Sequence, residues 1–244
     1  MTKQEIAEAV QTAKVHAVDE TGKIVGPKPA TRGGGRPRRG YYAADSVRVP
    51  AVTTITSRFK ESGGLIHWAN TMGLEGKTLD EAREPATSIG SVVHGMVEAY
   101  LHGEPVAEPT TLEAINGYQS FVEWWEAGAF TVEHTELPIV SETYRFGGTL
   151  DTILRDSKGR LCIGDWKTSN AVYEDYLWQI AAYGLLFEEW SGEKLEGGFH
   201  LARFSKDNAD FEHRHYFELD DAARLFLMFR ECYDLDKLVK KRAR

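Results

Sequence analysis

Three successive segments in the middle of the chain, residues 131–140, 143–154 and 160–168, have residue patterns typical of β-strands, and both faces of the third are largely apolar, which suggests burial on both sides. Side chains of a β-strand point to opposite faces in turn, so this pattern predicts three strands. The polar sequence Asp156-Ser157-Lys158-Gly159 separates the second segment from the third and predicts a tight turn, hence a hairpin. Residues 198–204 and 211–219 also have the pattern of strands, and we expect a further hairpin there.

Apolar residues recur with helical spacing on either side of these strands. The predicted helices span about residues 3–14, 62–72, 88–101, 112–127, 175–190 and 220–238, and residues 47–55 have the pattern of an extended segment. Helices before and after a mainly β centre indicate a single domain of the α+β (α/β/α) class, with a central mixed sheet flanked by helices. We expect this domain to cover residues 47–244. Residues 1–46 would form an N-terminal helix and a basic arm rich in Gly, Pro and Arg, with a mobile loop at 33–40.

Composition places the chain among globular proteins, with 244 residues of which 42% are hydrophobic and 27% charged. It has no apolar run of membrane-spanning length, and its first residues lack the apolar core of a signal peptide, so we expect no membrane contact and a cytoplasmic location. Cys162 and Cys232 show no C-x-x-C spacing. They indicate buried thiols in a reducing compartment rather than a disulfide framework or zinc site.

The charge distribution is uneven. Residues 23–60 hold nine Lys and Arg against one acid, a local net charge of +8 in a chain whose total is −8. Because local fields attract phosphates, the arm residues Arg32, Arg36, Arg38 and Arg39 are candidates for DNA contact, although a merely solubilising arm fits equally well. The glycines at 33–35 are not followed by G-K-[ST], so no nucleotide-binding P-loop is predicted.

The candidate chemistry lies on the predicted hairpin. Asp165 and Lys167 share one face of the segment 160–168, and Asp151 lies near the end of the neighbouring strand. A buried acid and a buried lysine are costly to desolvate unless they have partners. Two carboxylates and an ammonium group at one strand edge suit Mg²⁺. The competing interpretation is a structural Asp165–Lys167 ion pair beside an ordinary strand-end aspartate.

Two predicted helices carry polar pairs spaced four residues apart, and such pairs share one helix face. His94 and Glu98 form the first pair, in which the imidazole could bind a metal and the carboxylate could orient it. Gln179 and Tyr183 form the second, which could reach DNA phosphates or support the metal site. The alternatives are a surface His–Glu pair and a polar contact between helix and core.

Together these residues resemble the PD-(D/E)XK nuclease superfamily, in particular its RecB-type exonuclease branch. The motifs of that branch are present in order as Gly90…His94, Gly148…Asp151, Asp165-Trp166-Lys167 and Gln179…Tyr183. The segments 49–55 and 64–69 are also similar to the N-terminal part of phage-encoded members. The resemblance covers about residues 47–205 and implies a restriction-endonuclease-like core.

The resemblance also implies a role for each matching residue. Asp151 and Asp165 would hold Mg²⁺ or Mn²⁺ together with the backbone carbonyl of Trp166, and His94 would be a further ligand that favours manganese. Lys167 would act with the two aspartates in catalysis. Supporting or DNA-contacting roles would fall to Gln179, Tyr183, Glu98 and Glu136.

The function implied is metal-dependent hydrolysis of DNA phosphodiester bonds, by an exonuclease acting at DNA ends or on single strands. Recombination, repair or phage DNA processing would be its setting, in a bacterial or phage-infected cell, with DNA and a single-strand-binding or annealing protein as partners. Some relatives hold an iron–sulfur cluster with four cysteines; this chain has two, so no cluster is expected. Two alternatives stay open: a DNA-binding or assembly protein without catalysis on the same fold, and a structure-specific endonuclease.

Overall fold

The computed structural model describes residues 31–60 and 63–243. Its main sheet has six strands in the order β1-β4-β5-β6-β7-β8. These are β1 (Thr31–Arg32), β4 (Thr131–Val140), β5 (Gly147–Arg155), β6 (Leu161–Lys167), β7 (Gly198–Phe204) and β8 (Phe211–Tyr216). The pairs β1–β4 and β6–β7 are parallel and the other neighbours antiparallel, so the sheet is mixed, as predicted.

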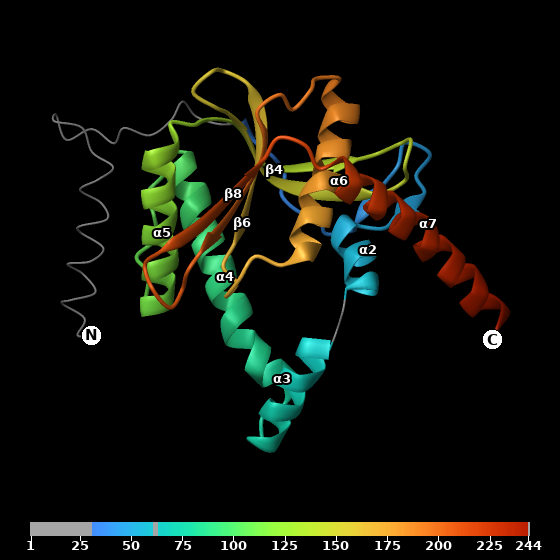
Figure 1. Cartoon of the computed structure of the whole chain (residues 1–244), viewed down its shortest axis with the longest axis horizontal. Helices are drawn as coiled ribbons and strands as arrows, with labels where there is room; N and C mark the ends of the chain where they lie inside the picture. The colour runs from blue at the N-terminus through green and yellow to red at the C-terminus, as the bar shows by residue number, and fades with distance from the viewer. Residues whose placement is uncertain (1–30, 61–62, 244) are drawn as a thin grey trace.

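Helices cover both faces of this sheet (Figure 1). On one side lie α4 (Leu79–Leu101) and α5 (Leu112–Gly128), and on the other α2 (Val52–Phe59), α6 (Glu174–Ser191) and α7 (Asp220–Arg242). The short helix α3 (Gly63–Leu74) lies at the lower end of the molecule, before α4. This arrangement confirms the predicted α+β class with a mixed sheet between helices.

Strand β6 is buried on both faces, which explains its nearly continuous apolar sequence. Cys162 and Trp166 join a core that includes Phe121 of α5. Leu161 and Ile163 point the other way, into a second core built with α2, α6 and α7. Any polar side chain at the end of this strand is therefore held in a dry, rigid environment.

The prediction of an extended segment at residues 47–55 is wrong beyond its first residues. Strand β3 (Arg48–Val49) is short, and α2 begins at Val52. Val52 and Ile55 lie one helical turn apart and are both fully buried in the second core. Packing of this face outweighs the preference of β-branched residues for strands, because intrinsic propensity is weaker than burial.

Helix α4 begins nine residues before the predicted start at residue 88, at Leu79. Thr78 accepts a hydrogen bond from the backbone N–H of Glu81, and the Glu81 side chain accepts from the backbone N–H of Thr78. This capping box satisfies the free N–H groups at the helix start. The predicted helix at residues 3–14 lies outside the described residues.

The described part of the predicted basic arm packs against the sheet, which differs from the expected mobile loop. The Gly33 N–H donates to the Thr135 carbonyl at 2.7 Å. Strand β2 (Tyr41–Tyr42) pairs with β3, and Tyr41 is only 5% exposed. The Tyr41 hydroxyl is 2.8 Å from Thr149 Oγ1 on β5. These contacts bring the arm to the strand that carries Asp151.

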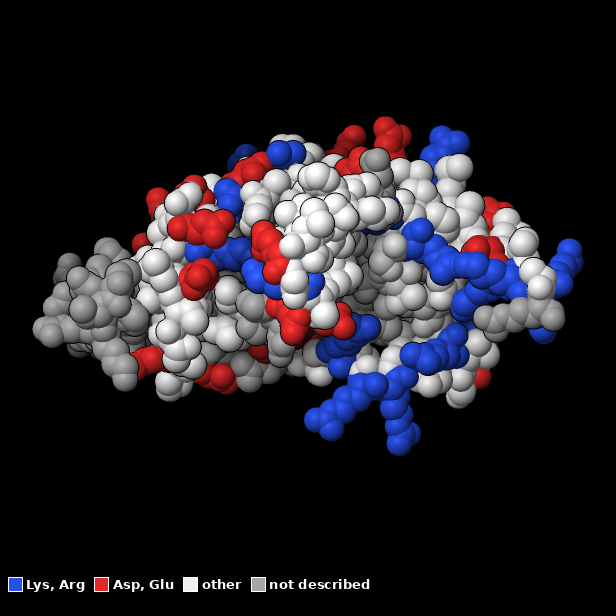
Figure 2. Space-filling model, turned by 90° about the horizontal axis from the view of Figure 1, so that it is seen from below, with Lys and Arg blue, Asp and Glu red and all other residues white. Residues whose placement is uncertain are grey.

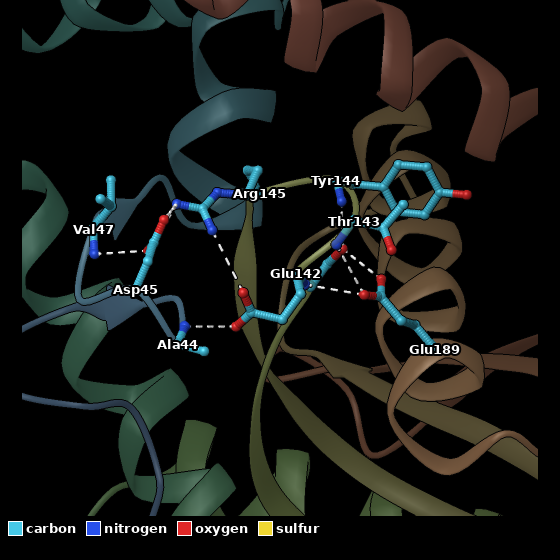
Figure 3. Close-up of polar contacts among 9 residues, drawn as sticks. Ala44, Asp45, Val47, Glu142, Thr143, Tyr144, Arg145 and Glu189 are labelled. Atoms are coloured by element: carbon cyan, nitrogen blue, oxygen red, sulfur yellow. Dashed lines mark hydrogen bonds and ion pairs between the residues drawn. The ribbon is translucent and has the colours of Figure 1, made fainter.

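A polar network fixes the end of the arm to the turn between β4 and β5 (Figure 3). Arg145 pairs with Asp45 at 2.8 Å and with Glu142 at 3.4 Å, and Glu142 accepts the Ala44 N–H at 2.8 Å. On the other side, Glu189 of α6 accepts the backbone N–H groups of residues 142 and 143. Arm, turn and α6 are thus tied together in front of the sheet edge.

Three histidines form a stack on β7 and β8. His200 Nδ1 is 2.9 Å from His213 Nε2, and the rings of His200 and His215 have centroids 4.1 Å apart. His200 is 4% exposed, and its Nε2 has no hydrogen-bond partner among the described residues. Burial, and then the neighbouring His215 and His213, lower the pKa of His200 to about 3.

We expect the pH dependence of stability to report this stack. Below the ordinary pKa of 6.5 the unfolded chain takes up a proton at His200, whereas the folded chain does so only near pH 3, so falling pH favours unfolding within this window. By pH 5 this difference in proton uptake at His200 should have lowered the free energy of unfolding by about 2 kcal/mol. Urea unfolding from pH 8 to pH 5 should show a shallower loss for His200→Phe than for wild type. The exposed-site control His67→Gln should follow wild type; a parallel His200→Phe curve would contradict the expectation.

Candidate metal centre

Strands β5 and β6 separate where the candidate site begins. Their pairing runs from Arg155↔Leu161 to Thr152↔Gly164 and stops before Asp151. Beyond that point the backbone N–H of Trp166 donates to a side chain of β5 instead of to its backbone. The acceptor is Oδ2 of Asp151, at 3.0 Å. The charge-assisted bond fixes the Asp151 side chain in the opening between the strands.

Three side chains from three elements converge at this opening. His94 of α4, Glu136 of β4 and Asp151 of β5 each offer one ligand atom, and these atoms all lie within 4.8 Å of one another. All three residues are partly buried. One imidazole nitrogen and two carboxylate oxygens form a donor set that suits Mn²⁺ or Mg²⁺.

Glu136 is held in an unusual backbone conformation, with φ of +46°. Its carbonyl accepts the Gly35 N–H at 3.1 Å. A Cβ atom at Gly33 would lie 2.0 Å from the Glu136 oxygen, so only glycine allows the arm to approach this closely. Left-handed geometry in a glutamate costs free energy, and the docked arm contacts the backbone of this residue directly.

The carboxylate of Glu136 is poorly compensated. Burial, followed by the charges of Asp151 and Glu98, raises the pKa of Glu136 to about 7. Carboxylates crowded in this way repel one another when ionised, and a divalent cation would remove the repulsion. The electrostatics of the three-residue cluster therefore fit a metal ion.

Asp165 lies next to this cluster at the end of β6 and is fully buried. Lys167 Nζ is 2.5 Å from Asp165 Oδ2, yet neither Asp165 oxygen makes a hydrogen bond of acceptable geometry to a described residue. Burial and the charge of Asp151 raise the pKa of Asp165, while Lys167 opposes the rise. Burial alone would lower the pKa of Lys167, but the two aspartates more than offset it and leave that pKa raised.

A pocket of about 170 Å³ opens beside the cluster. Glu136 and Asp151 form part of its wall, and the arm closes it from the other side. The remaining lining residues include Arg36, Tyr41, Thr53, Thr149 and Tyr183. A second, much smaller cavity of about 10 Å³ lies between α4 and the strands, lined by His94 and Glu98 as well as Glu136 and Asp151. The first pocket offers a cation and several hydroxyl groups beside the candidate metal ligands.

The structure groups the sequence-predicted residues unevenly. Asp165 and Lys167 form a pair of their own beside the cluster, whereas Glu136, predicted as a supporting acid, lies within it. The role of the Trp166 carbonyl stays a prediction. Gln179 Nε2 donates to the Tyr183 hydroxyl at 2.8 Å, and the ring of Tyr183 packs over Gly148. That ring occupies the space a Cβ at position 148 would need, which gives the glycine of the G-x-x-D motif a physical reason.

Among the arginines predicted to contact DNA, Arg36 lines the pocket. The backbone of Arg32 pairs with Thr135, and Arg38 and Arg39 are exposed in the turn that follows. Sequence reasoning did not identify the pocket residue Thr149. A signal was present for Thr149, because it lies two residues before Asp151 on the same predicted strand.

None of the described helices combines the length and apolar character needed to span a membrane. Comparison with known protein families found no matching family model. Comparison with curated proteins found no match either.

Solved structures include distant similarities. Protein SSO0001 is 22% identical, with a TM-score of 0.29, over 46% of this chain and 57% of that protein. A "Putative exonuclease" from Eubacterium rectale is 15% identical, with a TM-score of 0.33, over 69% of this chain and 65% of that protein. The chain thus spans less than two thirds of each. Because these similarities are distant, any functional assignment rests on the geometry of this chain's own residues.

Proposed function

We propose that this chain is a divalent-metal-dependent deoxyribonuclease, and specifically an exonuclease that acts at DNA ends or on single strands. The observation that supports it is the convergence of His94, Glu136 and Asp151 next to the buried Asp165–Lys167 pair. Two acidic groups whose pKa values are raised by burial, Glu136 and Asp165, lie at one opening in the sheet. Such clusters are costly to maintain and are concentrated at functional sites.

In this proposal His94, Glu136 and Asp151 would hold Mg²⁺ or Mn²⁺, and Asp165 Oδ1, which has no hydrogen-bond partner among the described residues, would face the same ion or its coordinated water. A bound divalent cation would neutralise phosphate charge and acidify a coordinated water. The chain's own groups do the rest. Lys167 keeps its proton, because its pKa is raised, and its ammonium group can offset negative charge that develops on the phosphate.

The surroundings of the site support a polyanionic substrate. Arg36 lines the pocket beside the cluster. Seen from below, Lys and Arg side chains gather over the right half of the molecule (Figure 2), the side on which Figure 1 shows α2 and α7. A positive surface beside a cleft raises the local concentration of phosphates and speeds association. Recombination, repair or phage DNA processing, with a single-strand-binding or annealing protein as partner, is the setting we propose.

Digestion of end-labelled DNA tests the proposal. The protein with Mg²⁺ or Mn²⁺ should release nucleotides from linear single-stranded or double-stranded DNA, and excess EDTA should stop the release. Covalently closed circular DNA should stay intact. Cleavage of the circular DNA would show an endonuclease and would contradict the proposed exonuclease activity. Binding of DNA without any hydrolysis across the metals would instead show a binding or assembly protein on this fold.

A further inference from the structure

Two tyrosines lie at the start of α6, beside Lys167. Tyr173 precedes the helix and Tyr176 lies in its first turn; their ring centroids are 5.6 Å apart in an edge-to-face arrangement. The ammonium group of Lys167 is 5.0 Å from the centroid of Tyr176. The aromatic pair is therefore a direct neighbour of a residue placed at the reaction centre.

A second lysine contacts the same rings from α2. Lys60 Nζ is 5.3 Å from the centroid of Tyr173 and 5.8 Å from that of Tyr176. It also pairs with Asp175 at 2.9 Å, which fixes its position between the two helices. Two cations thus flank one aromatic surface, one at the reaction centre and one nearer to solvent. We call Lys60, Tyr173 and Tyr176 the aromatic ledge.

Two of the three ledge residues, Tyr173 and Lys60, are open to solvent. Tyr173 is 45% exposed, and its side chain makes no capping hydrogen bond to α6. The side chain of Lys60 is 46% exposed. In Figure 1 the start of α6 and the end of α2 both lie on the lower side of the molecule, the side from which Figure 2 shows the basic surface. The ledge is more exposed than Lys167, whose side chain is 14% exposed.

We propose that the aromatic ledge binds an unpaired base of single-stranded DNA, with the base stacked on Tyr173 and a neighbouring phosphate held by Lys60. This inference rests on the proposed function and narrows it to unpaired strands, because inside a duplex the faces of the bases are already stacked on one another. Every base has a flat face for an aromatic ring, whereas paired bases in a duplex expose only their edges. The ledge would hold the strand so that an adjoining phosphate faces Lys167.

Equilibrium binding of a fluorescein-labelled oligothymidylate, measured by anisotropy in EDTA, tests the ledge without cleavage. Tyr173→Ala should weaken binding about 10-fold, since stacking contributes about 1–3 kcal/mol per base. Tyr173→Phe keeps the ring and should bind like wild type. For an abasic oligonucleotide of the same length, Tyr173→Ala and wild type should bind equally, because only the base is lost. Lys60→Gln should weaken binding to both oligonucleotides and lower the salt slope by about 1.

Tyr144→Ala is the matched control, because Tyr144 is a partly exposed tyrosine on the β4–β5 turn. It should bind oligothymidylate like wild type. Equal affinities of Tyr173→Ala and wild type for oligothymidylate, or no measurable binding by wild type, would overturn the ledge. Neither outcome changes the result expected from the DNA hydrolysis assay, so failure of this inference can be told apart from failure of the proposed function. If binding depends on Tyr173 but the protein hydrolyses no DNA, the proposal of base stacking on the ledge would stand and the proposed nuclease activity would be refuted.

Discussion

Asp151→Asn is expected to lower the rate of DNA hydrolysis about 1,000-fold or more while leaving the fold intact. Asparagine has the same shape, and its amide oxygen can still accept the Trp166 N–H that Asp151 accepts at 3.0 Å. It lacks the negative charge that a divalent cation requires from this position. Loss of metal-assisted charge stabilisation is worth several kcal/mol, and about 4 kcal/mol corresponds to the stated factor.

The measurement compares single-turnover rates on end-labelled DNA with manganese titrations by calorimetry. Asp221→Asn, an exposed aspartate in the first turn of α7, is the matched control and should keep both rate and affinity. Asp151→Asn should lose both together. Full activity in Asp151→Asn would remove the metal centre from the reaction, whereas normal Mn²⁺ binding with lost activity would place the ion elsewhere.

Lys167→Met is expected to destabilise the protein by about 3–5 kcal/mol at pH 8, the second large effect. The substitution leaves the carboxylate of Asp165 fully buried beside Asp151 with no opposite charge. Adding Asp165→Asn should restore most of the lost stability, because the double variant buries no uncompensated charge. It should still be inactive, since both groups are absent from the reaction centre.

Urea unfolding of wild type, both single variants and the double variant at pH 5 and pH 8 measures this coupling. The pKa of Asp165 is already raised in wild type, and removing Lys167 raises it further. The folded Lys167→Met variant therefore binds a proton at Asp165 more readily than its unfolded chain, so its loss of stability relative to wild type should shrink as pH falls. Additive effects at both pH values would show that Asp165 and Lys167 act independently.

Local sequence signals predicted most of the sheet and its helices. The residue patterns of β4 and β6 located both strands to within about a residue, and the turn at 156–159 joined β5 to β6 as expected. Such a pattern predicts a strand reliably there because it depends only on residues that are neighbours in the sequence. It failed at Val52 and Ile55, where β-branched residues form a helix because a distant core buries one side of it.

The candidate site was predictable in its residue types but not in its grouping. Asp151, Asp165, Lys167 and His94 could be proposed from motif order and spacing. The convergence of Glu136 with His94 and Asp151 depends on the left-handed backbone at Glu136, which the docked arm supports. No pattern in the sequence around Glu136 predicts a backbone conformation that is supported by a segment about 100 residues away. The ledge was missed for the same reason, because Lys60 and Tyr176 meet only through packing of α2 against α6.

The sequence by itself determined the order of the elements, the doubly buried β6 and the acids and lysine at its end. These follow from side-chain periodicity and the cost of burying charge, both of which act over a few residues. Only the tertiary structure decided that the Gly33–Arg36 segment closes a pocket beside Glu136 and that Asp165 pairs with Lys167 outside the three-residue cluster. Those outcomes depend on where β5 leaves β6 and on close approach of segments far apart in the chain, which packing of the whole domain sets.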